Sequence, residues 1–476
     1  MTTRDRWTSP LGERYASRAM LALWSPDRRY GLWRRLWLAL AEGERALGVP
    51  IPDEALDQMR RHLDDIDYEA VARYEKEFRH DVMAHIHAFG DAAPAARPFI
   101  HLGATSAYVT DNADLVLMRE GLALLRGRVI AVLTALAAFA RRWRNEPTLG
   151  YTHLQPAQLT TVGKRATLWM QDLVLDLADL DARRAALPLR GVKGTTGTQA
   201  SFLELFGGDH AKVRALEAQV CAAMGFERAM PVTGQTYTRK LDAQILGVVS
   251  GIAASAAKFS SDVRMLQSFG EMSEPFESGQ VGSSAMAYKQ NPMRCERIAS
   301  LARYVASIEG NANQTHAVQY FERTLDDSAN RRLVIPEAFL ATDAILLLMD
   351  NVARGLEVHG AQISRRIREE LPFMATEQLI VRAVEAGADR QEIHEVIRRH
   401  SVATAAAMKN DGAGNDLLDR LAADPAFPRA VDPRSVTDPA RFVGRASEQV
   451  DEFLSDVVDP ILSASGATVE TEAIRV

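Results

Sequence analysis

One long helical stretch constrains this chain more than any other part of its sequence. Residues 112–145 contain no proline, and Pro147 follows them. Asp111 or Thr110 can cap the start of this predicted helix. At about 1.5 Å per residue the helix would be about 50 Å long. Because it would extend beyond an ordinary domain, it requires packing partners of similar length.

Four further stretches can supply these partners. Residues 240–269 carry apolar side chains in steps of three, four and seven, which is the pattern of one helical face. Residues 156–187, 293–318 and 327–358 are predicted as further long helices, the last with a kink at Pro336. Five long helices predict an all-α fold built on a helical bundle.

Several of these helices carry small or apolar residues around much of their circumference. Ala135, Ala137, Ala138 and Ala140 are one such group. A single five-helix bundle would leave part of this surface in water. We therefore expect the bundle to pack against other copies of itself in a symmetric oligomer.

The pattern divides the chain into three predicted domains. Residues 1–105 form an N-terminal domain of short helices, residues 106–358 form the central bundle, and residues 359–476 form a C-terminal domain of shorter helices. Within the bundle, residues 269–292 carry three glycines and two prolines without a steady apolar period. A loop of this length is usually a functional lid or a disordered linker.

The composition argues against several classes of protein, including nucleic-acid-binding and membrane proteins. The 476 residues are 47% hydrophobic and 25% charged, with a formal net charge of -6, which is typical of a soluble globular protein and argues against nucleic acid as the main partner. The longest uncharged apolar run, residues 129–140, is shorter than a membrane span. No secretory signal is evident, and Cys221 and Cys295 lack metal-ligand spacing. We expect a cytoplasmic protein without a metal or cofactor.

The residues 282–292, Gly-Ser-Ser-Ala-Met-Ala-Tyr-Lys-Gln-Asn-Pro, carry the strongest chemical signal. A flexible glycine and serine connector is the simplest interpretation of such a segment. However, the hydroxyl of Ser283 lies close in sequence to the ammonium of Lys289 and the amide of Asn291. A hydroxyl that can act as a base, beside groups that can hold an oxyanion, suits carbanion chemistry.

Two histidine segments are further candidates. His153 precedes a predicted helix, where it is either a surface or cap residue or a proton donor near neutral pH. Arg79, His80 and Asp81 are followed by two more histidines, but the spacing is not that of a helical zinc motif. We expect this trio to face a cleft.

Three segments can bind an anion. The stretch 190–199 is rich in glycine and threonine with two cations, and it suits close packing as well as anion contact. Residues 321–332 open a helix with Arg323, Ser328 and Arg332, which form either a solvated helix cap or a phosphate site. An irregular arm near the N-terminus presents Arg14 and Tyr15.

Residues 282–292 resemble the signature loop of the fumarase/aspartase superfamily, Gly-Ser-Ser-x-Met-Pro-x-Lys-x-Asn-Pro, and the Glu-Arg-Thr-Leu-Asp-Asp-Ser-Ala-Asn-Arg-Arg string of residues 322–332 resembles its adenylosuccinate lyase branch. Ala287 replaces the usual proline, and Gln290 stands where close relatives tend to have arginine. Loss of the proline should leave the open loop with more conformations, at a cost of about 0.4 to 1 kcal/mol on closure.

The resemblance implies a β-elimination that releases fumarate from adenylosuccinate and from its imidazole-carboxamide analogue. It makes Ser283 the base and His153 the acid, with Lys289 and Asn291 stabilising a carboxylate. Glu296 would pair with Lys289 or, indirectly, with His153. His80 would also belong to the catalytic set. The substrate contacts implied are Arg14, Tyr15, Arg79, Asp81, Thr105, Ser106, Thr152, Gln235, Arg297, Arg323, Ser328 and Arg332.

The resemblance also implies a homotetramer whose active sites combine three chains. A sister lyase acting on argininosuccinate or malate would keep His153 and the loop but would not need the cluster from Arg323 to Arg332. A non-catalytic scaffold of the same fold would bind the ligand without turnover. The joint presence of Ser283, His153 and Lys289 argues against the scaffold.

Overall fold

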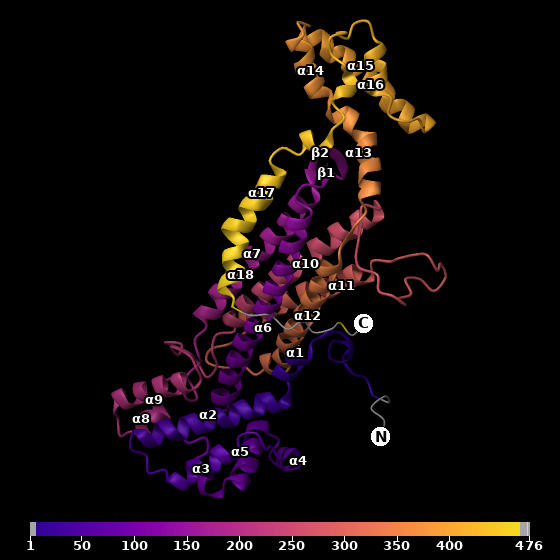
Figure 1. The fold of residues 1–476 in the computed structure, drawn as a ribbon. Coiled ribbons are helices and arrows are strands. Elements are labelled where there is room, and N and C mark those ends of the chain that lie inside the picture. The colour runs from indigo at the N-terminus through magenta and orange to yellow at the C-terminus, as the bar shows by residue number, and fades with distance from the viewer. Residues whose placement is uncertain (1–5, 467–473, 475–476) are drawn as a thin grey trace.

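The computed structural model describes residues 6–466 and residue 474. Its fold is all-α, as predicted, and the strands of the described residues form two short antiparallel pairs. Long helices run through the middle of the elongated chain (Figure 1). They are α6 (Ser106–Arg142), α7 (Val162–Ala186), α10 (Lys240–Ser268), α11 (Met293–Ala317) and α12 (Asp327–Gly355).

The central helix of this bundle is α6. It packs against α7 and α12, while α10 packs against α7, α11 and α12. Leu115, Leu122 and Leu133 of α6 are fully buried in the main hydrophobic core. Because its apolar residues occur on all sides, α6 needs neighbours around its circumference, which is the reason a bundle forms.

The start of α6 differs from the prediction. The helix begins at Ser106, about six residues earlier than expected, with Thr105 in the N-cap position. Asp111 and Thr110, expected as caps, lie inside the helix. Asp111 is 1% exposed and forms an ion pair with Arg239. Its charge therefore serves a tertiary contact, which the local sequence could not reveal.

A β-hairpin replaces the first part of a predicted helix. β1 (Pro147–Thr152) pairs with β2 (Gln155–Thr161), and α7 begins only at Val162. The Thr161 side chain caps α7 by accepting a hydrogen bond from the N–H of Lys164. A Cβ on Gly163 would lie 2.5 Å from the carbonyl oxygen of Ala140. Only glycine lets α7 start so close to the end of α6.

Shorter helices cover both ends of the bundle (Figure 1). At one end are α1 (Arg18–Leu23), α2 (Pro26–Ala46), α3 (Asp53–Arg61), α4 (Tyr68–Phe78), α5 (Asp81–Ala92), α8 (Ala200–Leu205) and α9 (His210–Ala223). At the other are α13 (Gly360–Met374), α14 (Thr376–Glu385), α15 (Arg390–Asp411) and α16 (Leu417–Ala423), and α14 to α16 enclose a separate hydrophobic core.

The chain then returns along the bundle. α17 (Ala446–Phe453) packs against α6 and α7, and α18 (Asp459–Ala464) packs against α6. The end of the segment predicted as a C-terminal domain therefore lies beside the central helices (Figure 1). Two of those helices, α6 and α10, contain windows apolar enough to span a membrane, of which 61% and 50% is buried within this single chain.

Candidate active site

A cavity of about 900 Å³ opens between α2, the start of α5, the start of α6 and the start of α12. Aromatic side chains of Trp24, Tyr30 and Trp33 form part of its wall. Many of the predicted site residues also line it. They are Arg79, His80, Asp81, Thr105, Ser106, Gln235, Arg323, Ser328 and Arg332. Residues from four separate sequence segments thus converge at one cavity.

His80 reaches the cavity because it is the N-cap residue of α5. Its Nδ1 accepts a hydrogen bond of 3.3 Å from the N–H of Met83. In the neutral ring the proton must then lie on Nε2, which is 3.4 Å from the Ser106 hydroxyl. Arg79, just before it, adopts the left-handed conformation that ends α4. The helix junction therefore orients the predicted trio.

The cations at the mouth of the cavity already have carboxylate partners. Arg332 lies 2.5 Å from Asp81, and Arg323 lies 2.8 Å from Asp327. The Arg332 side chain is 60% exposed and that of Arg323 is 25% exposed, whereas Asp327 is completely buried. Both guanidinium groups still reach the solvent and can contact an anion as well as their partners.

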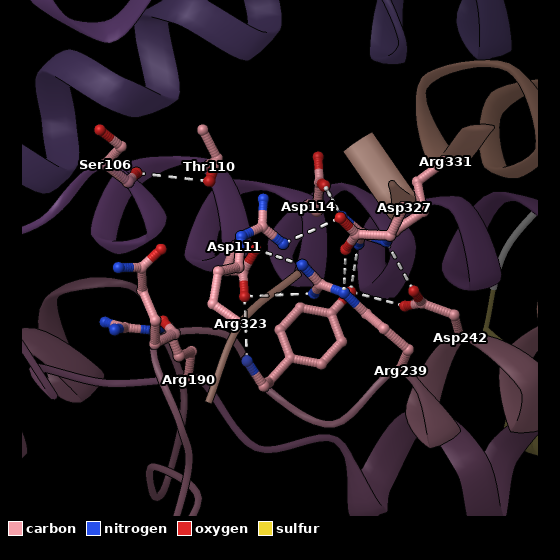
Figure 2. A network of polar contacts seen from close by, with 12 residues as sticks. Ser106, Thr110, Asp111, Asp114, Arg190, Arg239, Asp242, Arg323, Asp327 and Arg331 are labelled. Atoms are coloured by element: carbon pink, nitrogen blue, oxygen red, sulfur yellow. Dashed lines mark hydrogen bonds and ion pairs between the residues drawn. The ribbon is translucent and has the colours of Figure 1, made fainter. Parts of the chain in front are cut away.

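A buried ion network forms the floor of the cavity. Arg239 lies between Asp111 of α6 and Asp327 of α12, at 3.1 Å and 2.7 Å (Figure 2). Burial alone would raise the pKa of Asp111, but Arg239 and Arg331 outweigh it and hold that pKa below its usual value. Arg239 therefore fixes the start of α12 against α6.

The network continues through Tyr237 and Asp242. Arg331 lies 2.7 Å from Asp242 and 3.1 Å from Asp114, and it also donates to the Tyr237 hydroxyl. The same hydroxyl donates to Asp242 at 2.5 Å. These residues were not predicted from the sequence, although Arg331 lies beside the predicted Arg332. This floor of two arginines and four carboxylates supports the cations above it, since Asp327 also pairs with Arg323.

The glycine and threonine segment 190–199 serves packing. Arg190 is fully buried and donates to the carbonyl oxygens of Gln235 and Gly194, at 2.9 Å and 3.0 Å. Burial lowers the pKa of Arg190 to about 10. Lys193 is 3% exposed and lies 2.7 Å from Glu217. Both cations therefore bind partners within the chain, and the hydrogen bond from Arg190 holds the main chain of Gln235 at the cavity.

His153 lies at the tip of the β-hairpin. Thr152 pairs with Gln155, so the turn consists of His153 and Leu154 alone. Both have left-handed backbone conformations, with φ of 53° and 58°, and both side chains are exposed. Two-residue turns of this kind favour asparagine and glycine. A strained backbone at an exposed histidine is typical of a functional site.

Ser283 lies in the second half of the 269–292 loop that follows α10. Its Oγ accepts hydrogen bonds from the N–H groups of Met286 and Ala285, at 3.1 Å and 3.4 Å. These two donors can stabilise negative charge on the oxygen. The side chain amide of Asn291 donates to the carbonyl of Gly282 at 2.7 Å, while Lys289 is exposed. The loop thus brings the predicted base and its neighbours together locally.

The remaining predicted residues lie outside the cavity. Arg297 of α11 stacks over the Tyr15 ring at 5.6 Å, which places the N-terminal arm beside this helix. Arg14 and Thr152 are exposed. Across the described residues, no ion pair joins Glu296 to Lys289 or His153. Glu296 is exposed in the single chain, and its pairing stays a prediction.

The cavity, the hairpin tip and the Ser283 loop occupy different parts of the chain. The residues around the cavity include neither His153 nor Ser283. The hairpin β1–β2 lies near α13 at one end of the bundle, and the loop extends from the side of α11 (Figure 1). α5 begins at the cavity and lies at the opposite end of the bundle. One chain alone does not surround a small molecule with all three.

Comparison with known proteins identifies the family. A family model described as Lyase matches residues 52–307, and one described as Adenylosuccinate lyase C-terminus matches residues 372–453. Adenylosuccinate lyase of Saccharomyces cerevisiae is 49% identical and covers 100% of this chain and 99% of its own length. That of Schizosaccharomyces pombe is also 49% identical, with 98% of each chain covered. The chain belongs to the adenylosuccinate lyase family.

Membership in the adenylosuccinate lyase family confirms the resemblance seen in the signature loop. It also decides between the sister lyases, because the C-terminal match is to adenylosuccinate lyase and not to an argininosuccinate enzyme. A solved fumarate lyase from Mesorhizobium sp. BNC1 has a TM-score of 0.79, with 94% of this chain and 99% of that chain covered at 23% identity. This likeness supports the all-α fold.

Proposed function

We propose that this protein is an adenylosuccinate lyase, which splits adenylosuccinate into AMP and fumarate and splits succinyl-aminoimidazole-carboxamide ribotide into AICAR and fumarate. The observation that carries the proposal is the 49% identity to adenylosuccinate lyases over the full chain. The cavity of about 900 Å³, with aromatic walls and arginines at its mouth, suits a succinylated nucleotide.

The nucleotide phosphate binds near the start of α12 in this proposal. Arg323, Ser328 and Arg332 all line the cavity there. Charge-assisted hydrogen bonds from guanidinium groups favour phosphate, and the N-terminus of a helix adds to the favourable field. From another part of the assembly, Arg14 and Tyr15 also contact the phosphate, and Arg297 contacts a further polar group of the nucleotide.

The elimination needs a base and an acid on opposite sides of the succinyl group. The Ser283 oxygen, held by two backbone N–H groups, takes the proton next to a carboxylate. The electron pair forms the new C=C bond as the C–N bond breaks. His153 gives its proton to the departing nitrogen. Lys289 and Asn291, with Thr105 and Ser106, stabilise the negative charge that develops on the carboxylate.

Assembly of the site requires several chains. Because one chain keeps its cavity away from its own His153 and Ser283, we infer that other copies supply these groups. The proposed assembly is a homotetramer with each site formed by three chains. Its location is proposed to be cytoplasmic, which agrees with the two buried free cysteines.

Fumarate release tests the function directly. The purified protein should release fumarate from adenylosuccinate and not from argininosuccinate or malate. S283A should lower kcat by about 10²- to 10⁴-fold while still binding substrate, because only the proton transfer is removed. S284A, which removes the adjacent exposed hydroxyl, is the matched control and should retain activity. Near-normal kcat in S283A would refute the role of Ser283.

A further inference from the structure

A buried carboxylate joins the strand before His153 to the start of the Ser283 loop. Glu271 follows the end of α10 and is 1% exposed. Its Oε1 accepts a hydrogen bond of 2.5 Å from the Tyr151 hydroxyl, and Arg366 Nε lies 3.3 Å from the same oxygen. Tyr151 belongs to β1 and Arg366 to α13, which lie beside each other (Figure 1).

Stacking contacts fix the position of the Tyr151 ring. Its centroid lies 5.1 Å from that of Phe269, and Arg366 lies over the Phe269 ring at 4.5 Å. Arg165 of α7 donates a hydrogen bond of 2.5 Å to the carbonyl of Leu149 in β1. Burial and the bond to Glu271 raise the pKa of Tyr151, so its hydroxyl remains the hydrogen-bond donor.

Backbone and side-chain hydrogen bonds also fix the start of the 269–292 loop. The carbonyl of Glu271 accepts a hydrogen bond of 2.9 Å from the N–H of His359, and β3 (Met272–Ser273) pairs with β4 (Glu357–Val358). Glu274 accepts from the N–H groups of Arg294 and Cys295 at the start of α11. The exposed part of the loop therefore begins only after an anchored segment.

The Glu271 carboxylate is stabilised by Tyr151 and Arg366, its two side-chain partners described above. Among the described residues its Oε2 has no hydrogen-bond partner, although the atom is buried. A buried charge that loses one of its few compensating groups is strongly disfavoured. Removing the Tyr151 hydroxyl should therefore displace the carboxylate or the strand, and His153 lies in the turn that directly follows this strand.

We propose that Tyr151, Glu271 and Arg366 form a positioning cluster that holds the His153 turn and the Ser283 loop in fixed places on the bundle. This inference rests on the proposed function, in which these two segments carry the acid and the base. None of the three residues lines the nucleotide cavity. Substitution of these residues should therefore slow the chemical step and leave nucleotide binding unchanged.

The variant Y151F tests the cluster. We expect kcat to fall by about 10- to 100-fold, since misplacing a catalytic group by about 1 Å can cost this much, while KM changes by less than about threefold. The matched control is Y304F. The Tyr304 hydroxyl likewise donates to a carboxylate, that of Glu337, but it joins α11 to α12 away from the hairpin. Y304F should keep its kcat.

Hydrogen exchange supplies a readout that does not depend on activity. In the intact oligomer, Y151F should speed amide exchange in residues 147–161 and 269–274 and leave exchange in α12 unchanged. Y304F should not speed exchange in residues 147–161 and 269–274. If Y151F exchanges these amides at the same rate as the parent, or keeps the kcat of the parent, the inference is wrong. An active parent with an unaffected Y151F would refute the cluster alone, whereas a parent that releases no fumarate would refute the proposed function as well.

Discussion

Glu44 is a carboxyl group on α2 that the fold buries without compensation. It is completely buried, and within the described part of the chain neither of its oxygens has a hydrogen-bond partner. Burial raises its pKa to about 8. In the folded protein at neutral pH this side chain is therefore mostly protonated, whereas in the unfolded chain it is ionised.

Glu44 should make stability fall as the pH rises. Between about 4.5 and 8 the folded state binds more protons at this site than the unfolded state, so the free energy of unfolding decreases with pH. A shift of this size corresponds to at most about 4 to 5 kcal/mol. E44Q cannot ionise, so in urea unfolding it should be more stable than the parent at pH 8.5 and should show a weaker pH dependence.

The control for Glu44 lies two residues earlier on the same helix. Glu42 is 38% exposed and pairs with Arg60. E42Q should keep the pH dependence of the parent between pH 6 and 8.5. If E44Q loses stability with pH as steeply as E42Q does, Glu44 ionises freely in the folded protein and the prediction is wrong.

The residues of the cavity differ in how far the sequence could predict them. Arg323, Ser328 and Arg332 lie in one short motif, so their proximity follows from the chain itself. Arg239 and Asp111 are 128 positions apart, and their hydrogen bonds exist only once the bundle has folded. Asp111 instead suggested a helix cap, because a local rule was the only one that the sequence could support.

The Ser283 loop depends on one glycine where two of its segments approach each other. A Cβ on Gly282 would lie 2.1 Å from the carbonyl oxygen of Lys289. In G282A this contact must open, which separates Ser283 from Lys289 and weakens the bond from Asn291 to the Gly282 carbonyl. We expect kcat to fall by about 100-fold. The melting temperature should change little, because the loop is largely exposed.

Gly279 in the same loop provides the comparison for G282A. It has a φ of 83°, and a Cβ there would have no atom within 4 Å. G279A therefore tests backbone strain without a steric clash, and most of the kcat should remain. A G282A enzyme as active as G279A would show that the close approach in the loop has no role in turnover.

The elements were predictable where their pattern is long. The helix predicted at 240–269 corresponds to α10 (Lys240–Ser268), because apolar residues mark one face over eight turns. The hairpin was missed because β2 has seven residues, includes Pro156 and leads directly into a strong helical pattern. Its turn uses histidine and leucine in place of the asparagine and glycine that signal such turns.

At the scale of the whole molecule, a single chain leaves apolar surface exposed in the places where the proposed site is incomplete. Leu154 beside His153 is 68% exposed, Tyr288 in the loop is 85% exposed, and Phe321 near the cavity is 99% exposed. Copies of the chain that bring these three regions together would bury them and complete the site.

Mixing two inactive variants tests this assembly. If His153 and Ser283 of one site come from different chains, H153Q and S283A subunits can together form a site with both residues intact. In randomly mixed oligomers each site has a chance of about one half for either residue, so about a quarter of the parent activity should return. If one chain supplied both residues, no mixed site would be intact. Denaturing and refolding the two variants together, with each variant refolded alone as the control, and then measuring fumarate release distinguishes these outcomes.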